Sequence, residues 1–131
     1  MAKQTISTPD APEAVGPYSQ AVRCGDTVYV SGQLPIDPGT KAMPDSIEEQ
    51  ARQSLANIRA ILEAAGCTMA DVCRCGIFLT DLADFQAVNR VYASFFDGDF
   101  PARATVQVSG LPLGARVEID AIARVPGGRD R

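Results

Sequence analysis

The chain has 131 residues, of which 46% are hydrophobic and 21% charged, which suits one compact domain with its own core and is too short for two. Its net charge is −4 at pH 7. No run of Lys or Arg supplies the positive surface expected of a protein that binds nucleic acid, so we expect none as a partner.

The residue types that are missing restrict the chemistry of any active site. The chain has no histidine, which excludes Ser-His-Asp triads, Cys-His pairs and histidine-ligated zinc. Its two lysines, Lys3 and Lys41, lie near the N-terminus and in a loop, which disfavours a buried Schiff-base lysine. If the protein is an enzyme, we expect it to use carboxylate, guanidinium, hydroxyl, amide and water, without a metal or cofactor.

The sequence also predicts where the protein resides. No stretch has the apolar length of a signal region or a membrane span, so we expect a soluble, cytoplasmic protein that does not contact membranes. The four cysteines match no zinc-binding spacing and are interpreted as reduced thiols: Cys24, Cys67, Cys73 and Cys75. For Cys73 and Cys75 a second interpretation stays open, namely a soft-metal site or a disulfide.

The N-terminal part of the chain is dominated by turns and short strands. Residues 1–15 are polar and hold two prolines, so we expect an irregular lead-in. Two strands follow at residues 18–23 and 27–31, hinged at the turn dipeptide Gly25-Asp26. Residues 33–45 contain three prolines and are expected to form a loop.

A long amphipathic helix comes next. It should begin after Asp45 or Ser46, since either side chain can cap it, and should stop at Gly66. Its apolar residues recur at steps of four and three, which predicts one core-facing stripe: Ile47, Ala51, Leu55, Ile58, Leu62 and Ala65.

A buried strand is expected at residues 72–80, and a second helix from Asp81 or Asp84 through Phe96. Asn89 falls at the edge of that helix's apolar stripe, where a polar amide needs a partner. Either the sheet supplies this partner or the amide bonds to local backbone.

The last two strands are predicted at residues 102–109 and 115–125, and both alternate apolar and polar side chains. If they pair as a hairpin, Arg103 and Glu118 lie together on the polar face. A guanidinium beside a carboxylate can bind an anion and activate water. The alternative is a solvated face with ion pairs of small energetic value. Residues 126–131 are expected to be a frayed tail.

This order of elements predicts an α+β fold in which two helices cover one face of a mixed sheet. No element remains to cover the other face, on which this interpretation places Arg103, Thr105, Gln107 and Glu118. That face is then either solvated or closed by another copy of the chain.

Five segments occur in one order along the chain: GPYSQA at 16–21, VSGQLP at 30–35, QARQSLANIRAILEAAG at 50–66, FPARATVQV at 100–108 and VEIDAIA at 117–123. Together they resemble the reactive intermediate deaminase A family, also called RidA or YjgF-type proteins, over about residues 5–125. The resemblance implies a single RidA-like domain with a chorismate-mutase-like fold. It also implies a homotrimer in which the sheets form a central barrel, with clefts between subunits.

The resemblance further implies cofactor-independent hydrolysis of enamines and imines, namely 2-aminoacrylate, 2-iminopropanoate and 2-iminobutanoate, to 2-keto acids and ammonia. The family's arginine corresponds to Arg103 and its carboxylate to Glu118. Arg103 is expected to bind the substrate carboxylate, because its planar fork matches that group. Glu118 and the backbone carbonyl of Thr105 are expected to orient and deprotonate a water molecule. Thr105 stands where many members have cysteine.

The remaining cleft residues follow from the same resemblance. The family's cleft tyrosine corresponds to Tyr18, its strand-end serine to Ser31, followed by Gly32, and its helix asparagine to Asn89. Tyr18 is expected to cover the substrate, while Ser31 and Asn89 keep the cleft polar.

Two rival functions differ in class from an imine hydrolase. RNA cleavage, once attached to members of the family, is disfavoured by the acidic composition and by the lack of Trp and His. A trimer that binds keto acids without catalysis predicts saturable binding and no imine turnover. A turnover assay separates this alternative from the enzyme.

Overall fold

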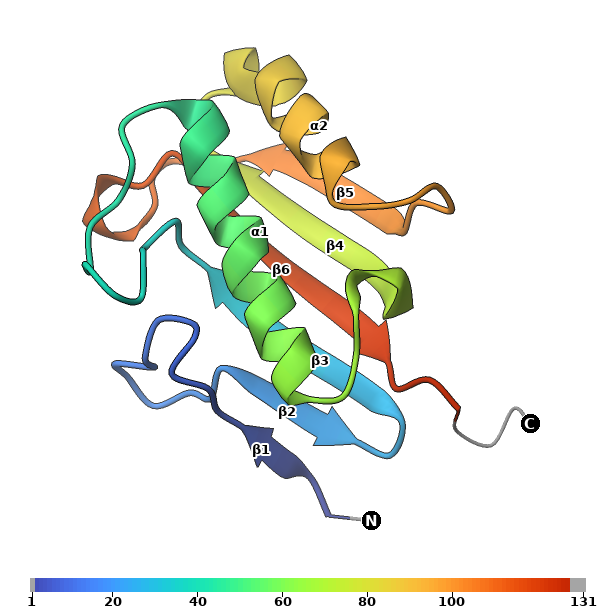
Figure 1. Ribbon diagram of the computed structural model, residues 1–131. Coiled ribbons are helices and arrows are strands. Elements are labelled where there is room, and N and C mark those ends of the chain that lie inside the picture. Colours follow the sequence, from blue (N-terminus) through green and yellow to red (C-terminus); the bar gives the residue numbers. More distant parts are fainter. Residues whose placement is uncertain (1, 128–131) are drawn as a thin grey trace.

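The computed structural model describes residues 2–127, which form one six-stranded sheet with two helices packed on one face (Figure 1). The strands are β1 (Gln4–Ile6), β2 (Ala21–Cys24), β3 (Thr27–Gln33), β4 (Val72–Leu79), β5 (Ala102–Gln107) and β6 (Val117–Arg124). The helices are α1 (Ile47–Ala64) and α2 (Phe85–Ser94), with short 3-10 turns η1 (Met69–Asp71), η2 (Leu82–Asp84) and η3 (Pro112–Gly114). The predicted α+β fold, with both helices on one face of a mixed sheet, is confirmed.

The strand order of the sheet is β1-β2-β3-β6-β4-β5. All neighbours are antiparallel except β4 and β5, which are parallel. The predicted hairpin of the last two strands is therefore wrong, because β4 lies between them. The physical reason is the crossover through α2, which returns the chain alongside β4 and places β5 at the sheet edge.

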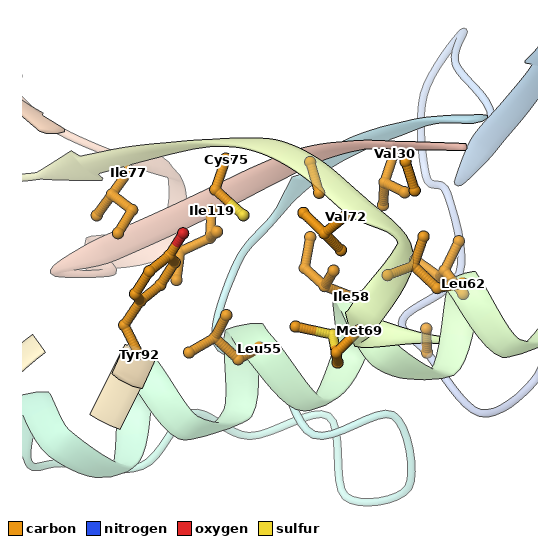
Figure 2. Close-up of a cluster of buried hydrophobic side chains, with 14 of the residues drawn as sticks. Val30, Leu55, Ile58, Leu62, Met69, Val72, Cys75, Ile77, Tyr92 and Ile119 are labelled. Carbon is orange, nitrogen blue, oxygen red and sulfur yellow. The ribbon is translucent and has the colours of Figure 1, made fainter. Parts of the chain in front are cut away.

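Helix α1 matches its prediction closely. Ser46 caps it by accepting a hydrogen bond from the Glu49 N–H at 3.1 Å, and Gly66 ends it in the left-handed region at φ 84°. All six residues of the predicted stripe are buried. They pack mainly against the apolar residues of β6 and β3, and Figure 2 shows Leu55 and Ile58 beside Ile119 of β6. Full burial of each large aliphatic side chain of this stripe stabilises the fold by about 1.5 to 3 kcal/mol.

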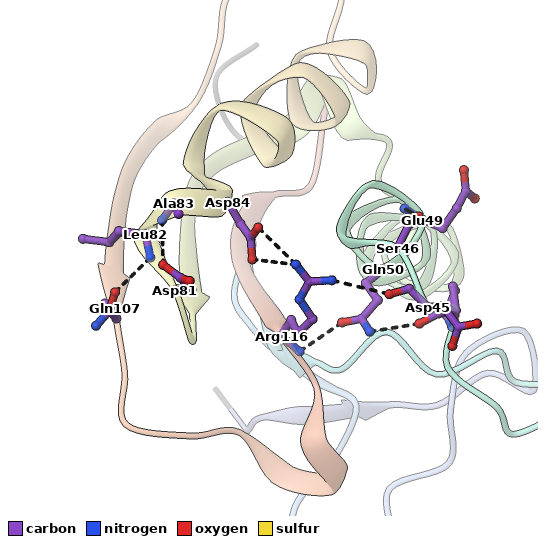
Figure 3. Close-up of polar contacts among 11 residues, drawn as sticks. Asp45, Ser46, Glu49, Gln50, Asp81, Leu82, Ala83, Asp84, Gln107 and Arg116 are labelled. Atoms are coloured by element: carbon purple, nitrogen blue, oxygen red, sulfur yellow. Dashed lines mark hydrogen bonds and ion pairs between the residues drawn. The ribbon is translucent and has the colours of Figure 1, made fainter.

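Arg116, just before β6, connects the sheet to the N-terminal ends of both helices (Figure 3). Its Nη2 contacts both carboxylate oxygens of Asp84 at 3.1 Å, and its backbone N–H donates to Gln50 Oε1 at 3.0 Å. Gln50 in turn donates to the carbonyl of Pro44 at 2.9 Å. These contacts fix the position of α2 on the sheet.

Other boundaries differ modestly from the predictions. Gln4–Ile6 in the predicted lead-in forms β1 and pairs with β2, a strand too short to show an alternating pattern. The second helix stops at Ser94 rather than Phe96, and Asp81 caps η2 rather than α2. Of the predicted tail, residues 126 and 127 form a turn, and 128–131 lie outside the described residues.

Two further predictions concern the state of the cysteine thiols and the presence of membrane-spanning helices. All four cysteines are free, and Cys73 is exposed whereas Cys75 is fully buried, so these two lie in different environments. Within residues 2–127, no helix has both the length and the apolar character needed to cross a membrane.

Candidate active site

Arg103 and Glu118 lie on opposite faces of the sheet, which corrects the prediction that they share one. Arg103 is in register with Cys75, a buried residue on the helix side, whereas Glu118 is in register with Phe78 on the open side. Residues paired across neighbouring strands point to the same face. Polar and apolar side chains alternate within each of these two strands as predicted. The prediction placed their polar faces together only because it paired the strands as a hairpin, which does not form.

The helix-side group surrounds the guanidinium of Arg103. Its Nη1 donates to Asn89 Oδ1 at 2.9 Å, and its Cζ lies 4.9 Å from the ring centre of Tyr92 and 5.7 Å from that of Phe85. The predicted need of Asn89 for a partner from the sheet is thus confirmed. In the described part of the chain, Arg103 forms no ion pair with a carboxylate. Arg103 is therefore an oriented cation whose other N–H donors are available.

Thr105 also faces the helices, in register with Ile77, so it does not lie on the open face as predicted. Its Oγ1 is buried and has no hydrogen-bond partner among the described residues. Gln107, in register with Leu79, likewise lies on the helix side, where its Oε1 accepts from the Leu82 N–H at 2.9 Å. The polar side chains of β5 thus face α2 and η2.

The open-side group is built around Glu118. It lies beside a register shift in β3 between Val30 and Gln33, where a Cβ on Gly32 would be 2.9 Å from the Glu118 carboxyl carbon. Burial raises the pKa of Glu118, and the negative charge of Asp120 raises it further. A half-buried carboxylate with a raised pKa is a stronger base than an exposed one once it is ionised.

Tyr18 and Ser31 complete this group. Ser31 Oγ donates to the carbonyl of Ser19 at 2.6 Å, which connects the end of β3 to the segment before β2. The Tyr18 side chain is 52% exposed. Tyr18, Ser31, Gly32 and Glu118 line one cavity of about 820 Å³. The rest of its wall is mostly apolar: Pro12, Val15, Leu34, Ile36, Pro112 and Leu113.

Two buried amides that hold the cavity walls escaped the sequence reasoning. Gln20 accepts from the Thr8 N–H at 2.7 Å and donates to the carbonyl of Pro12 at 2.8 Å. Asn57 donates to the carbonyls of Leu34 and Ile36 at 3.2 and 2.9 Å. The available signal was the position of Asn57 at the margin of the α1 stripe, where a buried amide must find partners.

The structure therefore divides the seven predicted site residues into two groups within one chain. Arg103, Asn89 and Thr105 lie on the helix side, and the other four line the open-side cavity. The fold and site define a small α+β domain with an oriented guanidinium on the helix side of its sheet and a half-buried carboxylate of raised pKa on the open side.

The sequence of residues 8–125 matches the family described as Endoribonuclease L-PSP, and the chain belongs to this family. The 2-iminobutanoate/2-iminopropanoate deaminase of Capra hircus is 50% identical over 124 residues, which are 94% of this chain and 90% of that protein.

Solved structures agree with this assignment. RidA from the Antarctic bacterium Psychrobacter sp. is 49% identical, with a TM-score of 0.91 over 93% of this chain and 99% of that chain. TdcF of E. coli with bound serine is 44% identical, with a TM-score of 0.90 over 92% and 98% of the two chains. The resemblance to RidA and YjgF-type proteins is confirmed.

Proposed function

We propose that this protein hydrolyses 2-iminobutanoate and 2-iminopropanoate, the latter also in its enamine form 2-aminoacrylate, to 2-keto acids and ammonia. Relatives named for this activity, from Capra hircus at 50% identity and Salmonella typhimurium at 47%, support the proposal. The structural observation that supports it best is the oriented guanidinium of Arg103, which has no carboxylate partner in the described part of the chain.

Arg103 binds the substrate through its carboxylate. Every 2-imino acid has this group next to the reacting carbon, and a guanidinium can donate two parallel N–H bonds to its oxygens. Because Asn89 already holds Nη1 from one side, the remaining donors keep a defined direction. The imine carbon is thereby held at a fixed distance from the groups that activate water.

Glu118 acts as the general base. The protonated imine carbon is electrophilic, so water oriented by Glu118 and by the backbone carbonyl of Thr105 adds to it and gives up a proton to the carboxylate. A carbon–oxygen bond forms, and the electrons of the carbon–nitrogen double bond return to nitrogen. The amine of this intermediate then takes up a proton, the carbon–nitrogen bond breaks to release ammonia, and the hydroxyl on carbon loses its proton as the carbonyl of the keto acid forms.

The complete site forms between two copies of the chain in a homotrimer. Arg103, Asn89 and the Thr105 carbonyl come from one subunit, while Glu118 and the cavity residues come from its neighbour. Two observations support this arrangement. Arg103 and Glu118 point to opposite faces of one sheet. The open face also exposes large apolar side chains, since Tyr29 is 49% and Val106 46% exposed.

Subunit complementation tests the shared site. Arg103→Lys and Glu118→Gln chains with different affinity tags are co-expressed, and mixed oligomers that hold both tags are purified. If the site is shared, a site is intact where one variant supplies its native Arg103 and the other its native Glu118, and each mixed trimer has one such site, so activity appears at about a third of the sites. If each chain holds a whole site, every site is defective and the mixture stays as inactive as the separate variants.

The turnover assay itself separates the enzyme from a trimer that only binds ligands. An amino-acid oxidase generates 2-iminobutanoate, and semicarbazide traps the imine that remains. We expect the purified protein to lower the trapped fraction in proportion to its concentration. Saturable binding of 2-oxobutanoate without any such decrease would establish the binding function instead. The same preparation, incubated with single-stranded RNA, is expected to leave it intact.

A further inference from the structure

The aromatic surroundings of Arg103 form a single surface on helix α2. Phe85, Asn89 and Tyr92 are spaced by four and three residues, so they lie along one side of the helix, toward β5. Asn89 bonds one nitrogen of the guanidinium, and the two rings lie 5.7 and 4.9 Å from its central carbon. A single hydrogen bond fixes one atom, whereas two ring faces also restrict the plane of the group.

Tyr92 is held rigidly in the core. It is only 4% exposed, and its ring packs against Phe96 with the ring centres 4.9 Å apart and the planes tilted by 50°. Its hydroxyl is buried beside the thiol of Cys75 (Figure 2), and burial raises the pKa of Tyr92, so the phenol stays neutral. The ring presents a fixed, uncharged face to Arg103, because any rotation of Tyr92 would open a void in the core.

We infer that Phe85 and Tyr92 are positioning residues for Arg103, which hold the plane of its guanidinium so that the free edge meets the substrate carboxylate. The inference rests on the proposed function. An unrestrained arginine side chain samples many rotamers, and this freedom has to be lost each time a ligand binds. A ring platform that restricts it beforehand should lower KM and the dissociation constant for carboxylate ligands.

A second arginine in the same protein also lies over an aromatic ring, but outside the two site groups. Arg59 of α1 lies 5.0 Å from the ring centre of Phe95, just after the end of α2. That pair joins the two helices, and neither residue belongs to the two site groups. Phe95 is half-buried like Phe85, so the pair supplies a matched control for the loss of a ring that supports an arginine.

The experiment compares Phe85→Leu, Tyr92→Leu and Tyr92→Phe with the control Phe95→Leu. KM and kcat are measured with 2-iminobutanoate, and the dissociation constant for 2-oxobutanoate by calorimetry. We expect each Leu variant at the platform to raise KM and the dissociation constant by about three- to thirty-fold, the range that cation–π energies imply. Tyr92→Phe keeps the ring and should recover most of the loss, while Phe95→Leu should leave both constants near parental values.

The measurements distinguish a failure of the proposed function from a failure of the ring platform. If the parent binds 2-oxobutanoate but does not hydrolyse the imine, the proposed function fails, and the binding constants still test the platform. If the parent is active and Phe85→Leu and Phe95→Leu have equal constants, the platform has no positioning role. Should Tyr92→Leu fail to fold, Phe85→Leu decides the question, because its side chain is only half-buried.

Discussion

A methyl group on Gly32 would lie 2.9 Å from the carboxyl carbon of Glu118, closer than side-chain carbons normally approach. Gly32→Ala must therefore move the carboxylate away from its present position. Because Gly32 does not occupy the left-handed region, the backbone can accept alanine without strain. We expect imine hydrolysis to fall about ten-fold or more, since misplacing a catalytic group by about 1 Å costs up to two decades of rate.

Gly110→Ala is the matched control for this substitution. Apart from its two chain neighbours, no described residue has a heavy atom within 4 Å of a Cβ placed on Gly110, so the added methyl group meets open space. Both variants should unfold in urea close to the parental midpoint. Equal hydrolysis rates for the two variants would show that the position of the Glu118 carboxylate does not limit turnover.

Arg103→Lys should reduce imine hydrolysis strongly while preserving the net charge. Lysine keeps the positive charge but lacks the planar fork and cannot reproduce the stacked geometry over Tyr92. The loss of one charge-assisted hydrogen bond costs roughly 1.5 to 3 kcal/mol, or about one to two decades of rate. Arg90→Lys, at an exposed position on helix α2, serves as the control. Equal rates of imine clearance in the two variants would exclude Arg103 as the carboxylate-binding group.

The pH dependence of turnover should respond to Asp120. Burial and the Asp120 charge both raise the pKa of Glu118, so a base that must be ionised loses activity as pH falls through this raised value. Asp120→Asn removes the charge while its amide oxygen can still accept the Gly76 N–H, now at 2.8 Å from Oδ1. In this variant we expect the acid limb of the kcat/KM profile to move to lower pH. The pKa that it reports should stay above that of an ordinary glutamate, because Glu118 remains half-buried.

Asp97→Asn, which removes the same charge from an exposed loop, should leave the acid limb in place.

The raised pKa of Glu118 also makes stability depend on pH, in the direction opposite to that of a salt-bridged carboxylate. Because the folded protein binds the Glu118 proton more tightly than the unfolded chain, ionisation of Glu118 lowers stability as pH rises through the raised pKa. Glu118→Gln should therefore unfold at a higher temperature than the parent at neutral pH, with the difference vanishing near about pH 4. A lower unfolding temperature at neutral pH would contradict this sign.

Asn57→Leu tests the buried amide that holds one wall of the cavity. The substitution removes the donor of the Ile36 carbonyl, whereas the Leu34 carbonyl still accepts from the Ile36 N–H at 2.8 Å. One buried unsatisfied group costs about 1 to 3 kcal/mol, so we expect a loss of this size in the free energy of unfolding, measured with urea. Gln53→Leu removes only the bond to Asn57 Oδ1 and should cost less than about 1 kcal/mol. If the two variants lose similar free energies of unfolding, the bonds from Asn57 to the loop carbonyls do not hold this wall of the cavity.

Local patterns predicted the elements of this fold well. The cap at Ser46, the stop at Gly66 and the stripe of α1 all depend on neighbouring residues, and all are confirmed. The turn at Gly25, in the left-handed region at φ 60°, likewise joins β2 and β3 as a hairpin. Such features follow from short-range sterics and hydrogen bonding, which a sequence displays directly.

The strand order required information that local patterns do not contain. The alternation in β5 shows that Arg103 and Thr105 share a face but not which face, because that depends on the neighbouring strand. Pairing with β4 rather than β6 turned both side chains toward α2. The ring platform of Phe85 and Tyr92 could not be predicted for the same reason, since it depends on strand pairing that places Arg103 against α2.

Strand β6 lies in the middle of the sheet although it is the last of the described strands (Figure 1). Its partner β3 is separated from it by most of the sequence, so their pairing closes a long loop and is intrinsically slow. On the ribosome, β3 and β4 cannot be joined until residues 117–124 have emerged from the exit tunnel. The nascent chain should therefore expose unpaired edges of both strands until β6 has emerged, which makes this interval its period of greatest risk of aggregation.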